Sequence, residues 1–174
     1  MYLIPAIRYK DEIIKASDAL RYSDNMMYYN GCMEHGRIYI HEDYDNGGKY
    51  QWAIVDKYEN LVGYIAYDVD HFARAAYSFG LIAFREDPDA IKAMAMGIRH
   101  AIKHIEAMHL HRIEFRCIWD NPARKRYEGI IKLMVNKHGY KALGFHLTDV
   151  FRDEFGEYHD CAIFELLDNN ESRN

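Results

Sequence analysis

Hydrophobic and polar residues between positions 75 and 145 alternate between the two-residue period of a strand and the helical period of 3.6 residues. The pattern predicts a strand over 74–85, a helix over 88–108, a strand over 111–119, a helix over 121–138 and a strand over 140–150. The first of these helices has an apolar stripe formed by Ile91, Met94, Ala95, Ile98, Ala101, Ile102 and Ile105. Asp87 suits its N-cap and Pro88 its first turn, while Gly139 suits the end of the second helix.

The rest of the pattern predicts mainly antiparallel strands. The predicted elements are a strand over 3–9 with Pro5 at a sheet edge, helices over 11–21 and 23–34, a polar loop over 41–48, a hairpin of strands over 50–56 and 61–70, and a last strand over 158–167. We therefore predict an α/β (α+β) fold with a mixed sheet, in which an antiparallel meander precedes strand–helix–strand–helix–strand. No linker or repeat interrupts the pattern, so a single domain is expected over 1–167, followed by a polar tail over 168–174.

The composition is that of an ordinary globular chain with a mild acidic bias. Its 174 residues are 49% hydrophobic and 28% charged, with a net charge of −5 and a sequence pI of about 6.0. No stretch approaches the ~18 apolar residues of a membrane span, and the start lacks the basic and apolar segments of a secretory signal. The acidic balance argues against a nucleic-acid partner, and three well-separated cysteines suit a reducing compartment. We expect a cytoplasmic protein that binds neither membrane nor nucleic acid.

Three short motifs in the second half of the chain occur in a recognisable order. Leu110–Cys117 forms a strand, Asp120–Ala123 opens the next helix with an asparagine, and Gly139-Tyr140 ends that helix and begins the next strand. Together with the order of the predicted elements, these motifs resemble the acyl-CoA-binding half of the GNAT superfamily of N-acyltransferases. The resemblance covers most of the chain. It implies a GNAT-like fold and acetyl-CoA as the co-substrate.

The resemblance also implies where acetyl-CoA would bind. Backbone groups at the end of the strand over 74–85 would contact the pantetheine arm, and Asn121 would support that arm. The phosphates would meet the start of the helix over 88–108 and the basic residues that open the last helix. The implied cofactor-binding residues are Ile82, Ala83, Phe84, Arg85, Lys92, Ala93, Asn121 and Arg124.

The pyrophosphate loop of this resemblance is degenerate. The superfamily pattern Gln/Arg-x-x-Gly-x-Gly/Ala falls on residues 88–93, where only Ala93 fits and both glycines are missing. Glycine lets a backbone approach a pyrophosphate closely, whereas a carboxylate repels it. Asp87 and Asp89 place negative charge at this point, partly offset by Arg85 and Lys92.

Acetyl transfer to an amine needs a base for the ammonium proton and an acid for the leaving thiolate. In many GNAT proteins a tyrosine in the last helix is this acid, and the resemblance makes Tyr127 the candidate. A tyrosine at this position also suits the buried stripe of the helix. The strand over 75–84 contains no carboxylate or histidine at the usual base position, so Glu114 on the next strand is the candidate base. The alternatives near the end of the preceding strand are Asp68, Asp70 and His71.

The sequence predicts no metal site. His100 and His104 are four residues apart on one helical face, but no further ligand completes the set, and both are expected to be exposed.

The predicted function is transfer of an acetyl group from acetyl-CoA to a primary amine of a small molecule or a protein. The alternative is a catalytically inactive GNAT-fold binding or scaffold protein. The acceptor and the oligomeric state stay open, with a homodimer as one alternative.

Overall fold

Seven strands and three α-helices make up the described part of the chain, which in this computed structural model comprises residues 2–20, 38–42, 47–85, 87–122, 124–153 and 156–169. The elements are β1 (Tyr2–Pro5), a 3-10 helix (Ala6–Tyr9), α1 (Lys10–Leu20), β2 (Lys49–Val55), β3 (Leu61–Asp70), β4 (Ala75–Ala83), α2 (Pro88–Ala107), β5 (Arg112–Ile118), α3 (Arg124–His138), β6 (Tyr140–Arg152) and β7 (Tyr158–Asp168). The predicted helix over 23–34, residues 43–46 of the polar loop and residues 170–174 of the tail lie outside the described residues.

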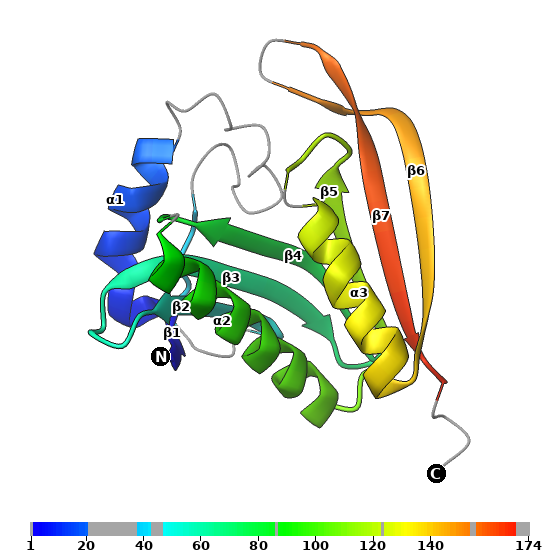
Figure 1. Cartoon of the computed structure of the whole chain (residues 1–174), viewed down its shortest axis with the longest axis horizontal. Coiled ribbons are helices and arrows are strands. Elements are labelled where there is room, and N and C mark those ends of the chain that lie inside the picture. The colour runs from blue at the N-terminus through cyan, green and yellow to red at the C-terminus, as the bar shows by residue number, and fades with distance from the viewer. Residues whose placement is uncertain are drawn as a thin grey trace. The chain divides into compact units, whose positions relative to one another are not determined.

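The strands form a mixed sheet in the order β1-β2-β3-β4-β5-β7-β6 (Figure 1). β2 pairs antiparallel with β1 and β3, β4 pairs parallel with β5, and β7 pairs antiparallel with β5 and β6. This confirms the predicted mixed-sheet fold and its element order. The chain groups into two compact units, Met1–Val69 with Ser78–His109 (unit 1) and Asp70–Tyr77 with Leu110–Asn174 (unit 2). The single domain over 1–167 stays a prediction.

In unit 1, α2 packs on the sheet through small side chains. Its buried residues are Ala90, Ala93, Met94, Gly97, Ala101 and Ile105. Ile91, predicted to be buried, is instead 49% exposed, and Ala95 is exposed as well, so the predicted stripe was wrong at these two residues. The reason is close approach between helix and sheet: a Cβ added at Gly97 would lie 2.9 Å from Cδ1 of Ile54 on β2. Only small residues fit at such a contact.

The first strand is shorter than predicted. β1 ends at Pro5, and residues Ala6–Tyr9 form a 3-10 helix that leads into α1. Proline has no backbone N–H to donate to a neighbouring strand, which limits the pairing at this point. β1 does lie at one end of the sheet order, as Pro5 predicted.

In unit 2, α3 begins at Arg124, three residues later than the predicted start at Asn121. Residues 119, 120 and 122 lie in turns, and the Arg124 N–H donates to the Asn121 carbonyl at 2.9 Å. The helix ends at His138, before Gly139 with a φ of 75°, as predicted. None of the described helices combines the length and apolar character that crossing a membrane requires.

Candidate functional site

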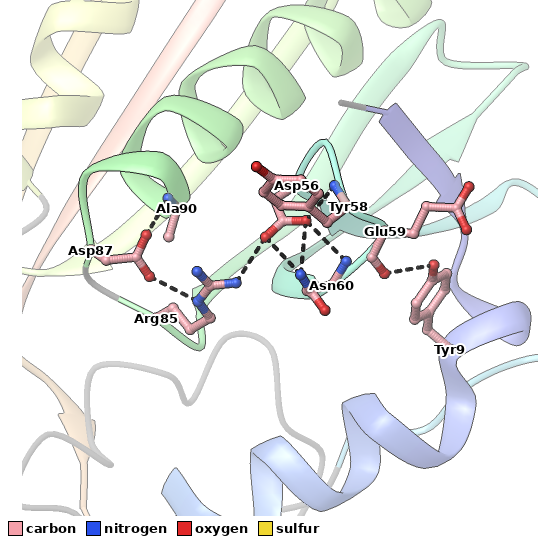
Figure 2. A network of polar contacts seen from close by, with 8 residues as sticks. All are labelled: Tyr9, Asp56, Tyr58, Glu59, Asn60, Arg85, Asp87 and Ala90. Atoms are coloured by element: carbon pink, nitrogen blue, oxygen red, sulfur yellow. Dashed lines mark hydrogen bonds and ion pairs between the residues drawn. The ribbon is translucent and has the colours of Figure 1, made fainter.

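The turn between β2 and β3 is organised by a buried carboxylate, Asp56, which is 4% exposed. Its Oδ1 accepts hydrogen bonds from the Tyr58 N–H at 2.8 Å and the Asn60 N–H at 3.0 Å, and the Asn60 side chain donates to both carboxylate oxygens at 3.2 Å (Figure 2). The Arg85 guanidinium lies 3.0 Å from Oδ2. Burial acts to raise the pKa of Asp56, but these hydrogen bonds outweigh it and lower the pKa to about 2.

The same arginine connects this turn to the start of α2. Arg85 Nε lies 2.8 Å from Oδ2 of Asp87, while Oδ1 of Asp87 accepts a hydrogen bond from the Ala90 N–H at 3.1 Å (Figure 2). Asp87 is thus the N-cap of α2, as its position before Pro88 predicted. The bonds from Ala90 and Arg85 lower the pKa of Asp87. Its carboxylate therefore stays ionised at the positive end of the helix dipole.

This arrangement bears directly on the predicted phosphate-binding residues. The guanidinium of Arg85 contacts two carboxylates of its own unit, so its charge serves the link between Asp56 and Asp87. Lys92 is exposed, whereas the side chain of Ala93 is 1% exposed and faces the core. The amide of Ala90, one of those that a diphosphate would meet at a helix start, binds the Asp87 carboxylate instead.

The three residues predicted to contact the pantetheine arm through their backbone lie at the end of β4 and directly after it. Ile82 is fully buried, and Ala83 and Phe84 are partly exposed. The Phe84 N–H donates to the Val62 carbonyl at 2.9 Å. That amide is therefore committed to β3, and a pantetheine contact at Phe84 would fall on its carbonyl oxygen.

In unit 2, the connection from β5 to α3 carries a stack of three side chains. The Arg124 guanidinium lies 4.1 Å from the centroid of the Trp119 ring, and the His146 ring stacks on Trp119 with centroids 3.7 Å apart and planes 14° apart. His146 Nε2 lies 2.6 Å from an oxygen of Asp160, and this contact lowers the pKa of the Asp160 carboxyl. Arg124 also lies 3.8 Å from Glu128 one turn along α3. Cation–π contact holds the cation at the helix start despite the unfavourable dipole.

Asn121 and Tyr127, the other two α3-linked candidates, lie close to this stack in sequence. The Asn121 N–H donates to the Ile118 carbonyl at 3.0 Å, which closes the turn after β5. The Tyr127 ring packs on Phe115 of β5, with centroids 5.8 Å apart, and the residue is partly exposed. Tyr127 is thus held on the face of β5 that α3 covers.

Glu114, the candidate base, belongs to an ion-pair network on β5. Its carboxylate lies 2.5 Å from Arg112 and 2.7 Å from Arg116, and its side chain is 13% exposed. Burial acts to raise the pKa of Glu114, but the bonds from Arg116 and Arg112 outweigh it and the pKa is lowered. A carboxylate held ionised by two arginines is a weak proton acceptor, so this geometry disfavours Glu114 as the base.

Several contacts that the sequence did not predict involve histidine. His104 was expected to be exposed, but it is partly buried and its Nδ1 lies 2.6 Å from the hydroxyl of Tyr67, which is 1% exposed. Near the C-terminal end of the chain, Asp153, Glu157 and His159 each place one side-chain atom that could bind a metal ion within 4.8 Å of the others. The contact between Tyr67 and His104 could not be predicted from strand alternation, because it depends on β3 and α2 becoming neighbours. The cluster of Asp153, Glu157 and His159 surrounds the turn between β6 and β7. The turn residues Asp56 and Asn60 were the one detectable signal for the network around Asp56.

Asp56→Asn should make the stability of the protein less sensitive to acid. The folded-state pKa of about 2 lies below the ordinary value of 3.8, so the ionised carboxylate contributes stability above about pH 4 that is lost as the pH falls through about 2. Urea midpoints measured from pH 6 to pH 2 should therefore differ widely between wild type and Asp56→Asn at pH 6 and converge at pH 2. Asp120→Asn, at an exposed turn position, is the control and should follow wild type. A constant gap between wild type and Asp56→Asn would contradict the assignment.

The fold places the chain in a class of known architecture. Its mixed sheet and the strand–helix–strand–helix–strand order are those of the GNAT fold of N-acetyltransferases, which confirms the predicted fold. One similar solved structure is the spermidine N-acetyltransferase from Vibrio cholerae in complex with CoA and spermine, 18% identical, covering 95% of this chain and 94% of that chain with a TM-score of 0.61. Another is the spermidine/spermine N-acetyltransferase SpeG from Vibrio cholerae in complex with manganese ions, 20% identical, covering 95% and 90% with a TM-score of 0.57. The sequence itself matches no protein-family model and no curated protein.

Proposed function

We propose that this protein is an N-acetyltransferase that moves an acetyl group from acetyl-CoA to a primary amine. The observation that supports this is the likeness of fold, over nearly the whole chain, to an acetyltransferase whose structure contains CoA and spermine. In the reaction the amine nitrogen attacks the thioester carbonyl and the C–S bond breaks. The amine loses a proton and the CoA thiolate gains one, so that the products are an amide and free CoA.

We assign the residues of this reaction as follows. Tyr127 donates the proton to the thiolate, Asn121 supports the pantetheine arm, and Arg124 and Lys92 contribute positive charge toward the phosphates. The proton of the ammonium group leaves through water, because Glu114 is held ionised by its arginines. Cys117 and Cys161 are both free, which suits the cytoplasmic location that we also propose.

Polyamines are the first acceptors to test. The printed names of the similar structures describe enzymes of spermidine and spermine. The net charge of −5 favours encounter with a cationic amine over an acidic one. Protein amines are the second group to test, with free CoA release as the common readout.

A second candidate function is a GNAT-fold protein that binds ligands without catalysis. The observation in its favour is the cap of α2, where the Asp87 carboxylate binds the Ala90 amide and Arg85 is paired with two carboxylates. A diphosphate would have to displace this carboxylate to reach the helix amides. The two candidate functions therefore differ in whether acetyl-CoA binds and turns over.

Acetyl-CoA should raise the melting temperature of the wild-type protein. At a ligand concentration a hundredfold above Kd the expected stabilisation is ~2.7 kcal/mol, or a shift of roughly 5–10 °C in the melting temperature.

Asp87→Ser keeps a good N-cap and removes a negative charge next to the phosphates, so it should tighten acetyl-CoA binding about tenfold, measured by calorimetry. Asp11→Ser, which removes an exposed carboxylate from the first turn of α1, is the matched control and should bind as wild type does. No thermal shift, together with no CoA release from a panel of polyamines, would favour the second candidate function.

A further inference from the structure

The strand β6 is long, lies at the edge of the sheet and exposes apolar side chains. It is the last strand in the sheet order and runs for 13 residues, of which Lys141–Val150 are all exposed. The exposed side chains include Leu143 at 36%, Phe145 at 50% and Leu147 at 38%. Beyond β7, β6 has no strand partner among the described residues. Long, flat and apolar edge strands of this kind pair readily with another chain.

These three side chains share one face of the sheet. Pairing is regular from Tyr140 to Leu147, and side chains alternate between the two faces along such a segment. Gly144 of β6 lies opposite Phe164 of β7, whose ring contacts Phe115 on the face that α3 covers. Leu143, Phe145 and Leu147 must therefore point to the opposite face. That face has no helix of unit 2 over it in the described residues.

The row formed by Leu143, Phe145 and Leu147 has two uncharged neighbours and one charged neighbour on β7. Phe145 lies opposite Ile163, and Leu147 lies opposite Cys161. Leu143 lies opposite Glu165, which is paired with Arg112 at 2.6 Å. The apolar surface is thus narrow and is bounded by an ion pair on one side and by the open backbone edge on the other. A partner must offer both backbone pairing and a short apolar row.

The sequence of β6 is complementary to itself when two copies run antiparallel. If Phe145 pairs with Phe145 of a second copy, Leu143 faces Leu147 on each side of a two-fold axis. These apolar pairs lie on one face of the sheet, because side chains alternate along the regular segment. A bulge follows Leu147, and Asp149 has a φ of 53°, so the regular pairing stops there.

We propose that β6 is a homodimer interface, in which the β6 strands of two copies pair antiparallel about Phe145 and join their sheets. A second copy is the favoured occupant because the row of Leu143, Phe145 and Leu147 is complementary to itself, so one two-fold operation pairs both this row and the open backbone edge. Cross-strand pairs of apolar side chains contribute favourably. The proposal does not depend on the enzymatic activity.

Sedimentation equilibrium of the full chain tests the interface. Wild type should be dimeric at micromolar concentration. Phe145→Lys places two like charges opposite each other at the axis, so it should weaken dimerisation at least tenfold. Phe72→Lys, at a residue that is 100% exposed in the β3–β4 turn, is the matched control and should dimerise as wild type does. A monomeric wild type, or a dimer unaffected by Phe145→Lys with unchanged circular dichroism, would overturn the proposal.

A cross-link tests the register independently. Directly opposed residues in antiparallel strands have Cα atoms about 4.5–5.5 Å apart, within the range that a disulfide spans. Phe145→Cys should therefore form a covalent dimer under mild oxidation, in a Cys161→Ser background that removes the neighbouring thiol. Phe72→Cys in the same background is the control and should stay monomeric on a non-reducing gel. A dimer in solution that Phe145→Cys does not cross-link would show that copies associate through another surface.

Discussion

Tyr127→Phe is expected to lower kcat for acetyl transfer about a hundredfold. General acid catalysis by a positioned side chain contributes roughly 10²–10⁴-fold, and phenylalanine removes the hydroxyl while it keeps the ring. The ring packs on Phe115 with centroids 5.8 Å apart, so the variant should preserve the fold and the position of α3. Acetyl-CoA affinity, measured by calorimetry, should stay within about twofold of wild type, because in the proposed reaction the Tyr127 hydroxyl acts only on the departing thiolate.

The control for this prediction is Tyr158→Phe. Tyr158 begins β7, is 60% exposed and has the Arg152 guanidinium 5.9 Å from its ring centroid. Its hydroxyl has no role in the proposed reaction, so kcat should be unchanged. If Tyr127→Phe keeps more than half of the wild-type kcat, Tyr127 serves packing and the proton reaches the thiolate by another route. A loss of acetyl-CoA affinity with unchanged kcat would likewise contradict the assigned role.

Gly63→Ala is expected to destabilise the protein by about 3 kcal/mol, at the upper end of the usual cost of overpacking a core. Gly63 lies in β3 and is buried. An added Cβ would lie 2.2 Å from Sδ of Met94 on α2 and 2.7 Å from the backbone oxygen of Ile82 on β4. Met94 could adjust, but the backbone of β4 could not move without disturbing its pairing. The melting temperature should fall by roughly 6–12 °C in a thermal scan.

Gly129→Ala is the matched control for Gly63→Ala. Gly129 lies inside α3, and an added Cβ there would meet nothing within 4 Å. Alanine has a higher helix propensity than glycine by up to about 1 kcal/mol, so this variant should be slightly more stable than wild type. If both substitutions had the same effect, the tight packing of α2 against β3 and β4 would be wrong.

The periodicity of the sequence was sufficient for the order and type of the described strands and α-helices, but not for the 3-10 helix over Ala6–Tyr9. Asp87 and Pro88 marked the start of α2, and Gly139 marked the end of α3, because caps and helix stops are local interactions. The hairpin of β2 and β3 followed from two alternating segments with a short polar link. The start of α3 was predicted three residues too early, since the turn at Asn121 resembles a helix start in sequence. Each of these features depends on residues only a few positions apart.

The candidate site could be predicted only in part. The glycine-less helix start and the carboxylates at Asp87 and Asp89 were visible in the sequence. The pairing of Arg85 with both Asp56 and Asp87 was not, because Asp56 lies 29 positions from Arg85. Glu114 differs, because Arg112 and Arg116 lie two positions away on the same strand, and strand alternation already places the three side chains on one face.

The amino-acid sequence determined the order of the strands and α-helices, the N-cap of α2 and the end of α3, together with the absence of glycines at the start of α2. Tertiary structure alone decided that Arg85 links Asp87 to Asp56, and that β6 lies at the sheet edge with Phe145 exposed. The physical reason is the range of the interactions. Periodicity and capping act within about one turn or one strand, whereas ion pairing, edge position and burial depend on segments that only folding makes neighbours.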